Sequence, residues 1–175
     1  VEELKKIWEP GSTVDSWNDV RPDFPDQGIK LYGPGTDSGT FDYFTDEIVG
    51  EEGASRPDYT PSEDDNVLVQ GVAGDKGSLG YFGFAYYEQN TDKLKLLGVD
   101  GGSGCIQPTR QTILDGTYSP LSRPLFVYVR KDSLARTEVA EFMRFYLTEG
   151  PELVAQVGYV ETPDSVYQEG LALLP

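Results

Sequence analysis

Residues 33–44 have the composition of a loop that binds a small anion. They read Gly-Pro-Gly-Thr-Asp-Ser-Gly-Thr-Phe-Asp-Tyr-Phe, a glycine-rich turn that runs directly into helical residues. Ser38, Gly39 and Thr40 fall where a helix has unpaired main-chain N–H groups and the positive end of its dipole. Several amides and two hydroxyls at that place suit phosphate or sulfate. Ser, Thr and Asp before a helix are also ordinary N-caps, so capping alone is the alternative interpretation.

The composition limits the kind of partner. The 175 residues include 30 Asp and Glu against 14 Lys and Arg, a formal charge of −16, and 38% are hydrophobic, which is enough to build a core. This acidity argues against nucleic acid and anionic membrane as partners, because both require a basic surface. It also repels an anion at long range, so any affinity for phosphate must come from short-range hydrogen bonds in a desolvated pocket.

The sequence shows no recognisable catalytic or metal-binding arrangement. Without histidine there is no Ser-His-Asp or Cys-His arrangement and no imidazole ligand, and Cys105 has no identifiable base. Acidic pairs occur by chance among so many carboxylates, and Gly74-Asp75-Lys76-Gly77 lacks the order of a nucleotide P-loop. We therefore predict no enzyme, no cofactor and no metal. Cys105 is interpreted as a small buried apolar residue, or as the partner of a cysteine outside these residues.

The elements around the turn follow from apolar spacing. The pattern predicts an amphipathic helix over residues 1–9, a loop through 26, a short buried strand over 29–32, and a helix after the turn whose apolar face is Phe41, Phe44, Ile48 and Val49. A strand, a glycine turn and a helix in this order place amide donors at the carboxyl end of the strand, where α/β proteins bind ligands.

Further elements alternate along the rest of the chain. Residues 50–61 read as a loop, and Ser62-Glu63-Asp64-Asp65 has the spacing of a capping box for the next helix. We then predict strands over 79–82, 94–99 and 124–129, and helices over 85–89, 109–115, 138–148, from 151, and 164–173. The apolarity of residues 124–129 suggests a strand buried on both faces. Aromatic residues 81–87 are interpreted as core packing, with a stacking platform as the alternative.

Three segments together carry a family resemblance. The turn at 33–44, Ser62-Glu63-Asp64-Asp65-Asn66-Val67-Leu68-Val69-Gln70-Gly71 and Gly80-Tyr81-Phe82-Gly83-Phe84-Ala85-Tyr86-Tyr87 resemble, in the same order, the phosphate-binding proteins of high-affinity phosphate ABC importers. That family belongs to the type II periplasmic-binding-protein superfamily. The resemblance implies an α/β fold, a periplasmic-binding-protein-like lobe with a mixed, mostly parallel sheet flanked by helices.

The resemblance also implies a domain organisation. Members have two α/β lobes that enclose the anion, and the first lobe is made from both ends of the chain. Residues 1–120 resemble the second, middle lobe, and residues 121–175 resemble the return strand and C-terminal helices of the first lobe, whose N-terminal part is absent. We therefore expect about half of a binding site here. The strand over 125–129 would lack a neighbour and expose an apolar edge, which a dimer would cover.

The family's anion-binding element maps onto Ser38, Gly39 and Thr40. Many members have an arginine four residues before that serine, where this chain has Pro34. The resemblance implies Arg56 as the replacement guanidinium, with a surface ion pair to Asp58 or Glu52 as the alternative. Arg123 is a second basic candidate, either for the ligand or for a salt bridge between lobes. Asp37 and Asp42 would repel an anion, so we expect them to cap amides or to hold an arginine.

The function that these observations imply is anion capture without chemistry. We expect a periplasmic or extracellular solute-binding protein that takes up inorganic phosphate and delivers it to an ABC transporter permease, with a membrane anchor outside these residues as one arrangement. The alternative is a non-transport extracellular sensor or interaction module on the same scaffold, with weak or no anion binding. The missing arginine at Pro34 motivates that alternative.

Overall fold

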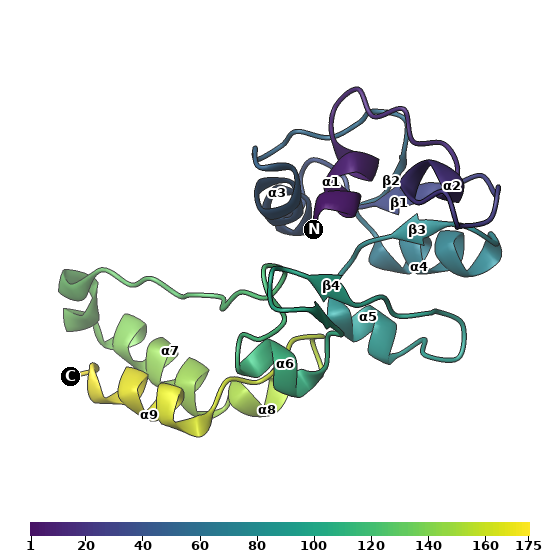
Figure 1. Ribbon diagram of the computed structural model, residues 1–175. Coiled ribbons are helices and arrows are strands. Elements are labelled where there is room, and N and C mark those ends of the chain that lie inside the picture. Colours follow the sequence, from purple (N-terminus) through teal and green to yellow (C-terminus); the bar gives the residue numbers. More distant parts are fainter.

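The computed structural model describes residues 1–175 as two bodies connected by extended chain (Figure 1). The first body contains the N-terminal elements through β3, and the second contains α5 onward. The elements of the first body are α1 (Glu2–Trp8), α2 (Trp17–Val20), β1 (Leu31–Gly33), α3 (Gly39–Phe44), the π-helix η1 (Thr45–Val49), β2 (Thr60–Pro61), α4 (Asp65–Gly74) and β3 (Leu79–Gly80). Those of the second are α5 (Phe84–Glu88), β4 (Val99–Asp100), β5 (Cys105–Ile106), α6 (Arg110–Leu114), the 3₁₀ helix η2 (Lys131–Ala135), α7 (Thr137–Thr148), α8 (Pro151–Val154) and α9 (Asp164–Ala172).

A parallel sheet of order β2-β1-β3 forms the centre of the first body. The register pairs Tyr32 with Thr60 on one side of β1 and Leu31 with Leu79 on the other. The strands β4 and β5 form a separate antiparallel pair. The predicted fold class, a mixed and mostly parallel sheet flanked by helices, is confirmed. Because β1 is the central strand, the glycine turn that follows it lies between β2 and β3, at the carboxyl ends of the strands.

An aromatic core holds the sheet and the first helices together. The Trp8 ring, 1% exposed, makes edge-to-face contacts with Phe44, Tyr59 and Tyr81, whose ring centroids lie 5.7, 5.6 and 4.8 Å away. The predicted packing roles of Trp8 and Tyr81 are confirmed. Such rings dominate the apolar area that a small core buries.

The helix after the glycine turn is buried on the predicted face. Phe41, Phe44, Ile48 and Val49 are each at most 8% exposed. Inside the helix, the Thr45 hydroxyl donates to the Phe41 carbonyl over 2.8 Å and accepts from the Gly53 amide over 2.8 Å. The helix ends at Gly50, whose φ of +92° favours glycine. This anchoring fixes the direction of α3 and therefore of its first turn.

The N-cap of α4 differs from the prediction by two residues. The cap is Asp64, which accepts from the Asn66 amide over 2.9 Å, whereas Ser62 lies outside the helix. The Ser62 amide still donates to the Gly33 carbonyl, over 3.1 Å, at the end of the β1–β2 pair. Since Ser62 is held at the sheet edge, the helix can begin only after it. The loop predicted through residue 26 likewise contains the short helix α2, which a capping box of Ser16 and Asp19 begins.

Two strand predictions in the second body were wrong. Residues 124–129 form no strand, and their side chains are exposed instead of buried on both faces. Of residues 94–99 only Val99 belongs to a strand, β4. Both segments lack the neighbouring strands that burial would require. For the same reason Cys105 is exposed, contrary to the burial predicted for it, because β5 pairs only with β4.

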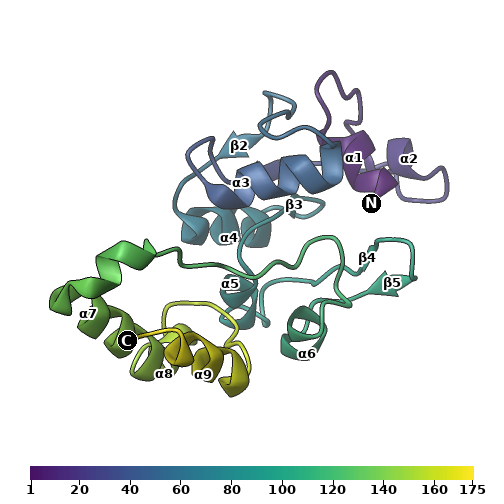
Figure 2. The ribbon, with the colours of Figure 1, turned by 90° about the vertical axis from the view of Figure 1, so that its left-hand side faces the viewer.

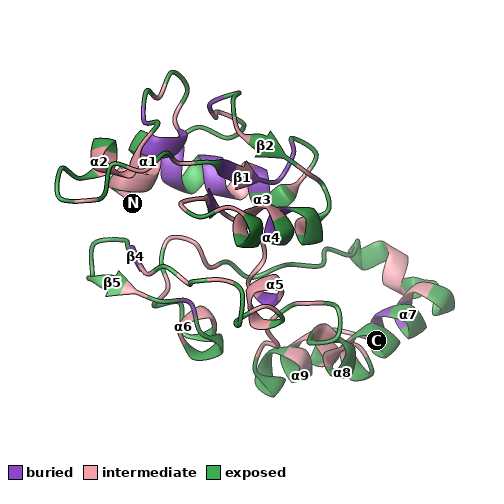
Figure 3. Ribbon diagram, turned by 90° about the vertical axis from the view of Figure 1, so that its right-hand side faces the viewer, coloured by how far each residue is buried: buried purple, intermediate pink, exposed green.

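The predicted C-terminal helices are confirmed as α7, α8 and α9. Figure 2 shows α7 and α9 side by side, and a Cβ on Gly170 would lie 3.2 Å from the Leu147 side chain. In α7 only Ala140 and Met143 are buried, while Phe142 and Phe145 are 60% and 57% exposed. Figure 3 shows most of this region as exposed or intermediate.

Arg110 connects α6 to Glu88 and Glu161 through ion pairs of 2.8 Å.

A prediction about stability follows from Tyr81. Its hydroxyl is buried without a hydrogen-bond partner, and burial raises the pKa of this phenol. An unpaired buried hydroxyl costs roughly 1–3 kcal/mol, so we expect the Tyr81→Phe variant to be at least as stable as the natural chain. Urea denaturation measures the difference. A Tyr59→Phe variant is the control, because the Tyr59 hydroxyl donates to the Pro34 carbonyl over 2.9 Å and its removal should destabilise. A Tyr81→Phe loss of more than about 1 kcal/mol would contradict the assignment.

Candidate functional site

Ser38 begins α3 by capping it. Its backbone is extended, with φ −97° and ψ 125°, and its Oγ accepts from the Thr40 amide over 3.2 Å. The Ser38 amide donates to the Gly35 carbonyl over 3.2 Å, which closes the glycine turn. Two of the three predicted amide donors are therefore engaged within the chain. The capping alternative raised by the sequence is present in the structure.

Other hydrogen-bond donors at this turn have no acceptor within the protein. The Gly39 amide and the hydroxyl hydrogens of Ser38 and Thr40 donate to no group of the protein. Gly39 and Thr40 are exposed, and Ser38 is half-buried. One main-chain N–H and two hydroxyls at the positive end of a helix can therefore be offered together to an oxyanion.

Arg123 lies beside these donors, although 84 residues separate it from Gly39. Its Nη2 donates to the Gly39 carbonyl over 3.0 Å, and its guanidinium lies 4.4 Å from the centre of the Tyr43 ring. The Tyr43 hydroxyl in turn donates to the carbonyls of Pro120 and Ser122, the latter over 3.2 Å. Arg123 makes no salt bridge, so of its two proposed roles the one between lobes is not seen here.

Sequence reasoning missed Tyr43 as a positioning residue. It follows Gly39 by four residues, a spacing that places both on one helix face, and this was the available signal. Burial, with the negative charge of Glu47 adding to it, raises the pKa of the Tyr43 phenol. The hydroxyl therefore stays protonated and remains a donor to the chain at 120–122.

The carboxylates near the turn do not have the roles that we predicted. Asp37 and Asp42 neither cap an amide nor hold an arginine with their side chains. Instead Glu63, before α4, reaches the turn: its Oε1 accepts from the Asp37 amide over 3.4 Å, and a Cβ on Gly35 would lie 2.0 Å from the same atom. Glycine at position 35 leaves room for this carboxylate. Its charge opposes an anion at the turn, which makes local donors more important.

Arg56 lies away from the turn and is buried, with 5% of its surface exposed. The guanidinium forms a fork with Asp58, of 2.6 Å from Nε and 2.8 Å from Nη2. Its Nη1 donates to the carbonyls of Ile7 and Val14, over 3.2 and 2.8 Å, and Nη2 also approaches Asp15 at 3.4 Å. These contacts use all five N–H donors of the group.

The arrangement around Arg56 matches the ion pair with Asp58 that was the alternative to a ligand role, although the arginine is internal and Glu52 takes no part. The hydrogen bond to Asp58 raises the pKa of Arg56, and the same bond lowers the pKa of Asp58. Arg56 and the turn at 38–40 are therefore not brought together, and the ligand role of Arg56 stays a prediction without an open donor to support it.

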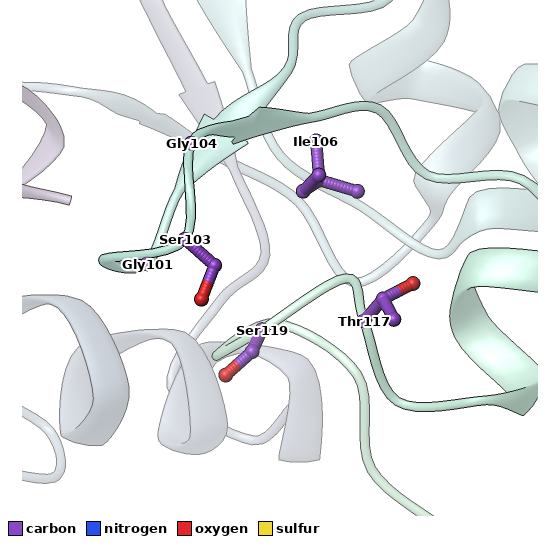
Figure 4. A pocket seen from close by; sticks show the side chains of 6 residues that line it. All are labelled: Gly101, Ser103, Gly104, Ile106, Thr117 and Ser119. Carbon is purple, nitrogen blue, oxygen red and sulfur yellow. The ribbon is translucent and has the colours of Figure 1, made fainter.

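Two hollows occur elsewhere on the chain. One, of about 60 Å³, is lined by Gly101, Ser103, Gly104, Ile106, Thr117 and Ser119, and Figure 4 shows Ser103 and Ser119 on neighbouring loops. The other, of about 510 Å³, lies along α4 and includes Asn66, Gln70, Asn90 and Lys93. Neither includes residues 38–40. No group of three or more His, Cys, Asp or Glu side chains is arranged to hold a metal ion.

Comparisons with known proteins place this geometry in context. Residues 1–149 match the family described as a PBP superfamily domain. Protein SphX of Synechocystis sp. is 54% identical over 173 residues, covering 97% of this chain and 52% of its own length. Phosphate-binding protein PstS of Staphylococcus haemolyticus is 38% identical over 172 residues, covering 97% and 52%. The chain thus spans about half the length of the curated relatives it matches.

Solved structures agree with this fold. A possible phosphate binding protein from Planctomyces limnophilus is 48% identical, with a TM-score of 0.87 over 98% of this chain and 62% of that one. PstS from Borrelia burgdorferi, 23% identical with a TM-score of 0.66 over 93% of this chain and 62% of that one, supports the fold alone.

Proposed function

The chain belongs to the PBP superfamily, and from this membership we propose that it serves to capture inorganic phosphate outside the cytoplasm for an ABC importer. The names of its relatives, phosphate-binding proteins among them, support phosphate as the ligand. The proposed partner is the transporter permease, and the proposed action is binding and release without catalysis. None of the helices is both long and apolar enough to cross a membrane.

The observation that carries this proposal is that hydrogen-bond donors at the start of α3 have no acceptor within the protein. We assign to Ser38, Gly39 and Thr40 the contacts with phosphate oxygens, through one amide and two hydroxyls. Arg123 would supply the guanidinium beside them, because its side chain is exposed and already lies against Gly39. A ligand role for Arg56 would require this group to exchange its protein partners for phosphate. We therefore propose that Arg56 stabilises the N-terminal body through its hydrogen bonds to Ile7, Val14 and Asp58.

The same proposal includes the lobe arrangement. Residues 1–120 would belong to the middle lobe, and residues 121–175 would supply the return strand and C-terminal helices of the other. Supporting this, the chain passes back over α3 at 120–123, where Tyr43 and Arg123 make contacts between distant segments. A pocket with donors from one side cannot exclude water, so we expect these residues to bind phosphate with a dissociation constant of ~1 µM or weaker.

Thermal unfolding in phosphate tests the function. At a phosphate concentration of ten times the dissociation constant, binding to the folded state adds about 1.4 kcal/mol and raises the unfolding midpoint. Sodium chloride at the same ionic strength is the control for screening. We expect protection that saturates with phosphate and is absent with chloride.

A second function, an extracellular sensor or interaction module without anion binding, has two observations in its favour. Pro34 replaces the family's arginine, and the donors of Arg56 are used internally. Unfolding midpoints that are equal in phosphate and in chloride would favour this module and overturn phosphate capture.

A further inference from the structure

Tyr43 on α3 is attached to the segment that carries Arg123. Its hydroxyl donates to the carbonyls of Pro120 and Ser122, the latter over 3.2 Å, which are main-chain groups just before the arginine. Leu121, between these two residues, packs against the core cluster of the first body and adds a second attachment. The main chain that leads into Arg123 is therefore fixed to α3 and to the core.

The Tyr43 ring also contacts the guanidinium itself. The guanidinium carbon of Arg123 lies 4.4 Å from the centre of the ring, within the range of a cation–π interaction. Its Nη2 donates to the Gly39 carbonyl over 3.0 Å, and a Cβ on Gly39 would lie 3.5 Å from the same nitrogen. Tyr43 follows Gly39 by one helical turn, so the ring and the carbonyl share a helix face. Together they hold the end of the arginine side chain beside the donors at 38–40.

This arrangement holds Arg123 without neutralising it. Six of the seven arginines in the chain form a salt bridge, and Arg123 forms none. Its single hydrogen bond to the protein uses one of its five N–H groups. Burial raises the pKa of the Tyr43 phenol, and the charges of Glu47 and Asp46 raise it further, so carboxylates lie near the place where the arginine is held. The ring and the carbonyl take the position that a carboxylate partner would otherwise fill.

We propose that Tyr43 is a positioning residue for anion binding, which holds the guanidinium of Arg123 beside the amide and the hydroxyls of residues 38–40. This role presupposes the proposed capture of phosphate at the turn. An exposed arginine has many rotamers, and holding it before the ligand arrives removes part of the entropy cost of binding. A planar guanidinium can donate to two phosphate oxygens at once, but only in one orientation. Tyr43 therefore raises the affinity without touching the anion.

A double-mutant cycle with inorganic phosphate as the ligand tests this role. Calorimetric titration gives the dissociation constant of the natural chain, Tyr43→Leu, Arg123→Met and the chain with both changes. We expect Arg123→Met to weaken binding about 10-fold or more, because it removes charged hydrogen bonds. Tyr43→Leu should weaken binding about 5-fold in the natural background. In the Arg123→Met background the same change should cost less than a factor of about two, because the group that Tyr43 positions is gone.

Tyr43→Phe is the conservative variant, and the cycle is run with it as well, so that the test stands if leucine unfolds the chain. Phenylalanine keeps the ring under the guanidinium and removes only the hydroxyl, so we expect an affinity between those of the natural chain and Tyr43→Leu. Tyr167→Phe on α9 is the matched control, because its half-buried side chain makes no hydrogen bond to the protein. Its dissociation constant should stay within a factor of about two of the natural value. Circular dichroism shows that each variant is folded.

The Arg123 side chain gives a readout that needs no ligand. An aromatic ring shifts the resonances of protons above its face, so the Arg123 Nε–H signal should move in Tyr43→Leu and stay in place in Tyr167→Phe. Equal weakening by Tyr43→Leu in both backgrounds, or an Arg123 signal that Tyr43→Leu leaves in place, would overturn the positioning role while phosphate capture stands. A natural chain that binds no phosphate would instead overturn the proposed function, and this role with it.

Discussion

Replacing Arg56 by methionine is expected to lower the free energy of unfolding by about 3–5 kcal/mol. The guanidinium is 5% exposed and satisfies the carbonyls of Ile7 and Val14 together with the carboxylate of Asp58. Methionine fills a similar volume but leaves these acceptors without a donor. Urea denaturation at pH 7 measures the loss. Since the acceptors belong to α1 and to the segment after it, the attachment of the N-terminal helix should fail first.

Arg21→Met is the matched control for that variant. Arg21 pairs with Glu3 at the surface, where their side chains are 52% and 46% exposed, so we expect a change of less than about 1 kcal/mol. If Arg56→Met lowers the free energy of unfolding no more than the control does, Arg56 does not stabilise the N-terminal body as proposed.

Acid should reduce the difference between Arg56→Met and the natural chain. Arg56 lowers the pKa of Asp58 in the folded state. A lowered carboxyl pKa contributes stability above the unfolded pKa, near 3.9, and that contribution disappears as the pH falls through the folded value. Urea denaturation of both proteins at pH 7 and at successively lower pH values below about 3.9 therefore follows the ion-pair part of the loss as it disappears, while the part due to the unpaired carbonyls remains.

Replacing Thr40 by valine is expected to weaken phosphate binding about 10- to 100-fold. A hydrogen bond to a charged group contributes roughly 1.5–3 kcal/mol, and valine keeps the shape of threonine while removing the hydroxyl. The Thr40 side chain is exposed and donates to no protein group, so folding should not change. Calorimetric titration with phosphate measures the effect.

The control for Thr40→Val is Thr60→Val on β2. Thr60 is also exposed and its side chain makes no hydrogen bond, but it lies in the sheet and not at the start of α3. We expect its affinity for phosphate to equal that of the natural chain. Equal weakening in both variants would show that the loss does not come from the turn.

Local features of the sequence predicted most helices because their signals lie within a few residues. The apolar face of Phe41, Phe44 and Ile48, the cap at Ser38 and the stop at Gly50 all act within one helix. The same locality explains why α7, α8 and α9 were found. By contrast, the strand predicted over 124–129 depended on neighbouring strands, which local apolarity does not specify.

The sequence named Arg56 and Arg123 as candidates, but it did not predict their partners, because those contacts join distant residues. Arg56 finds its carbonyl acceptors 49 and 42 residues away in Ile7 and Val14, and Arg123 reaches Gly39 across 84 residues. No spacing rule connects such pairs. Only Tyr43, one helical turn after Gly39, carried a local signal, because residues four apart share a helix face.

The most direct test of the central claim is a ¹⁵N–¹H spectrum of the chain titrated with phosphate. If the start of α3 binds the anion, the amide of Gly39 moves first and furthest, Thr40 follows, and Thr40→Val suppresses both shifts. The amide of Gly102, which donates to Asp100 over 2.8 Å, should stay in place as an internal reference. A Gly39 amide that does not respond, while phosphate shifts signals elsewhere or none at all, would contradict phosphate capture at this turn.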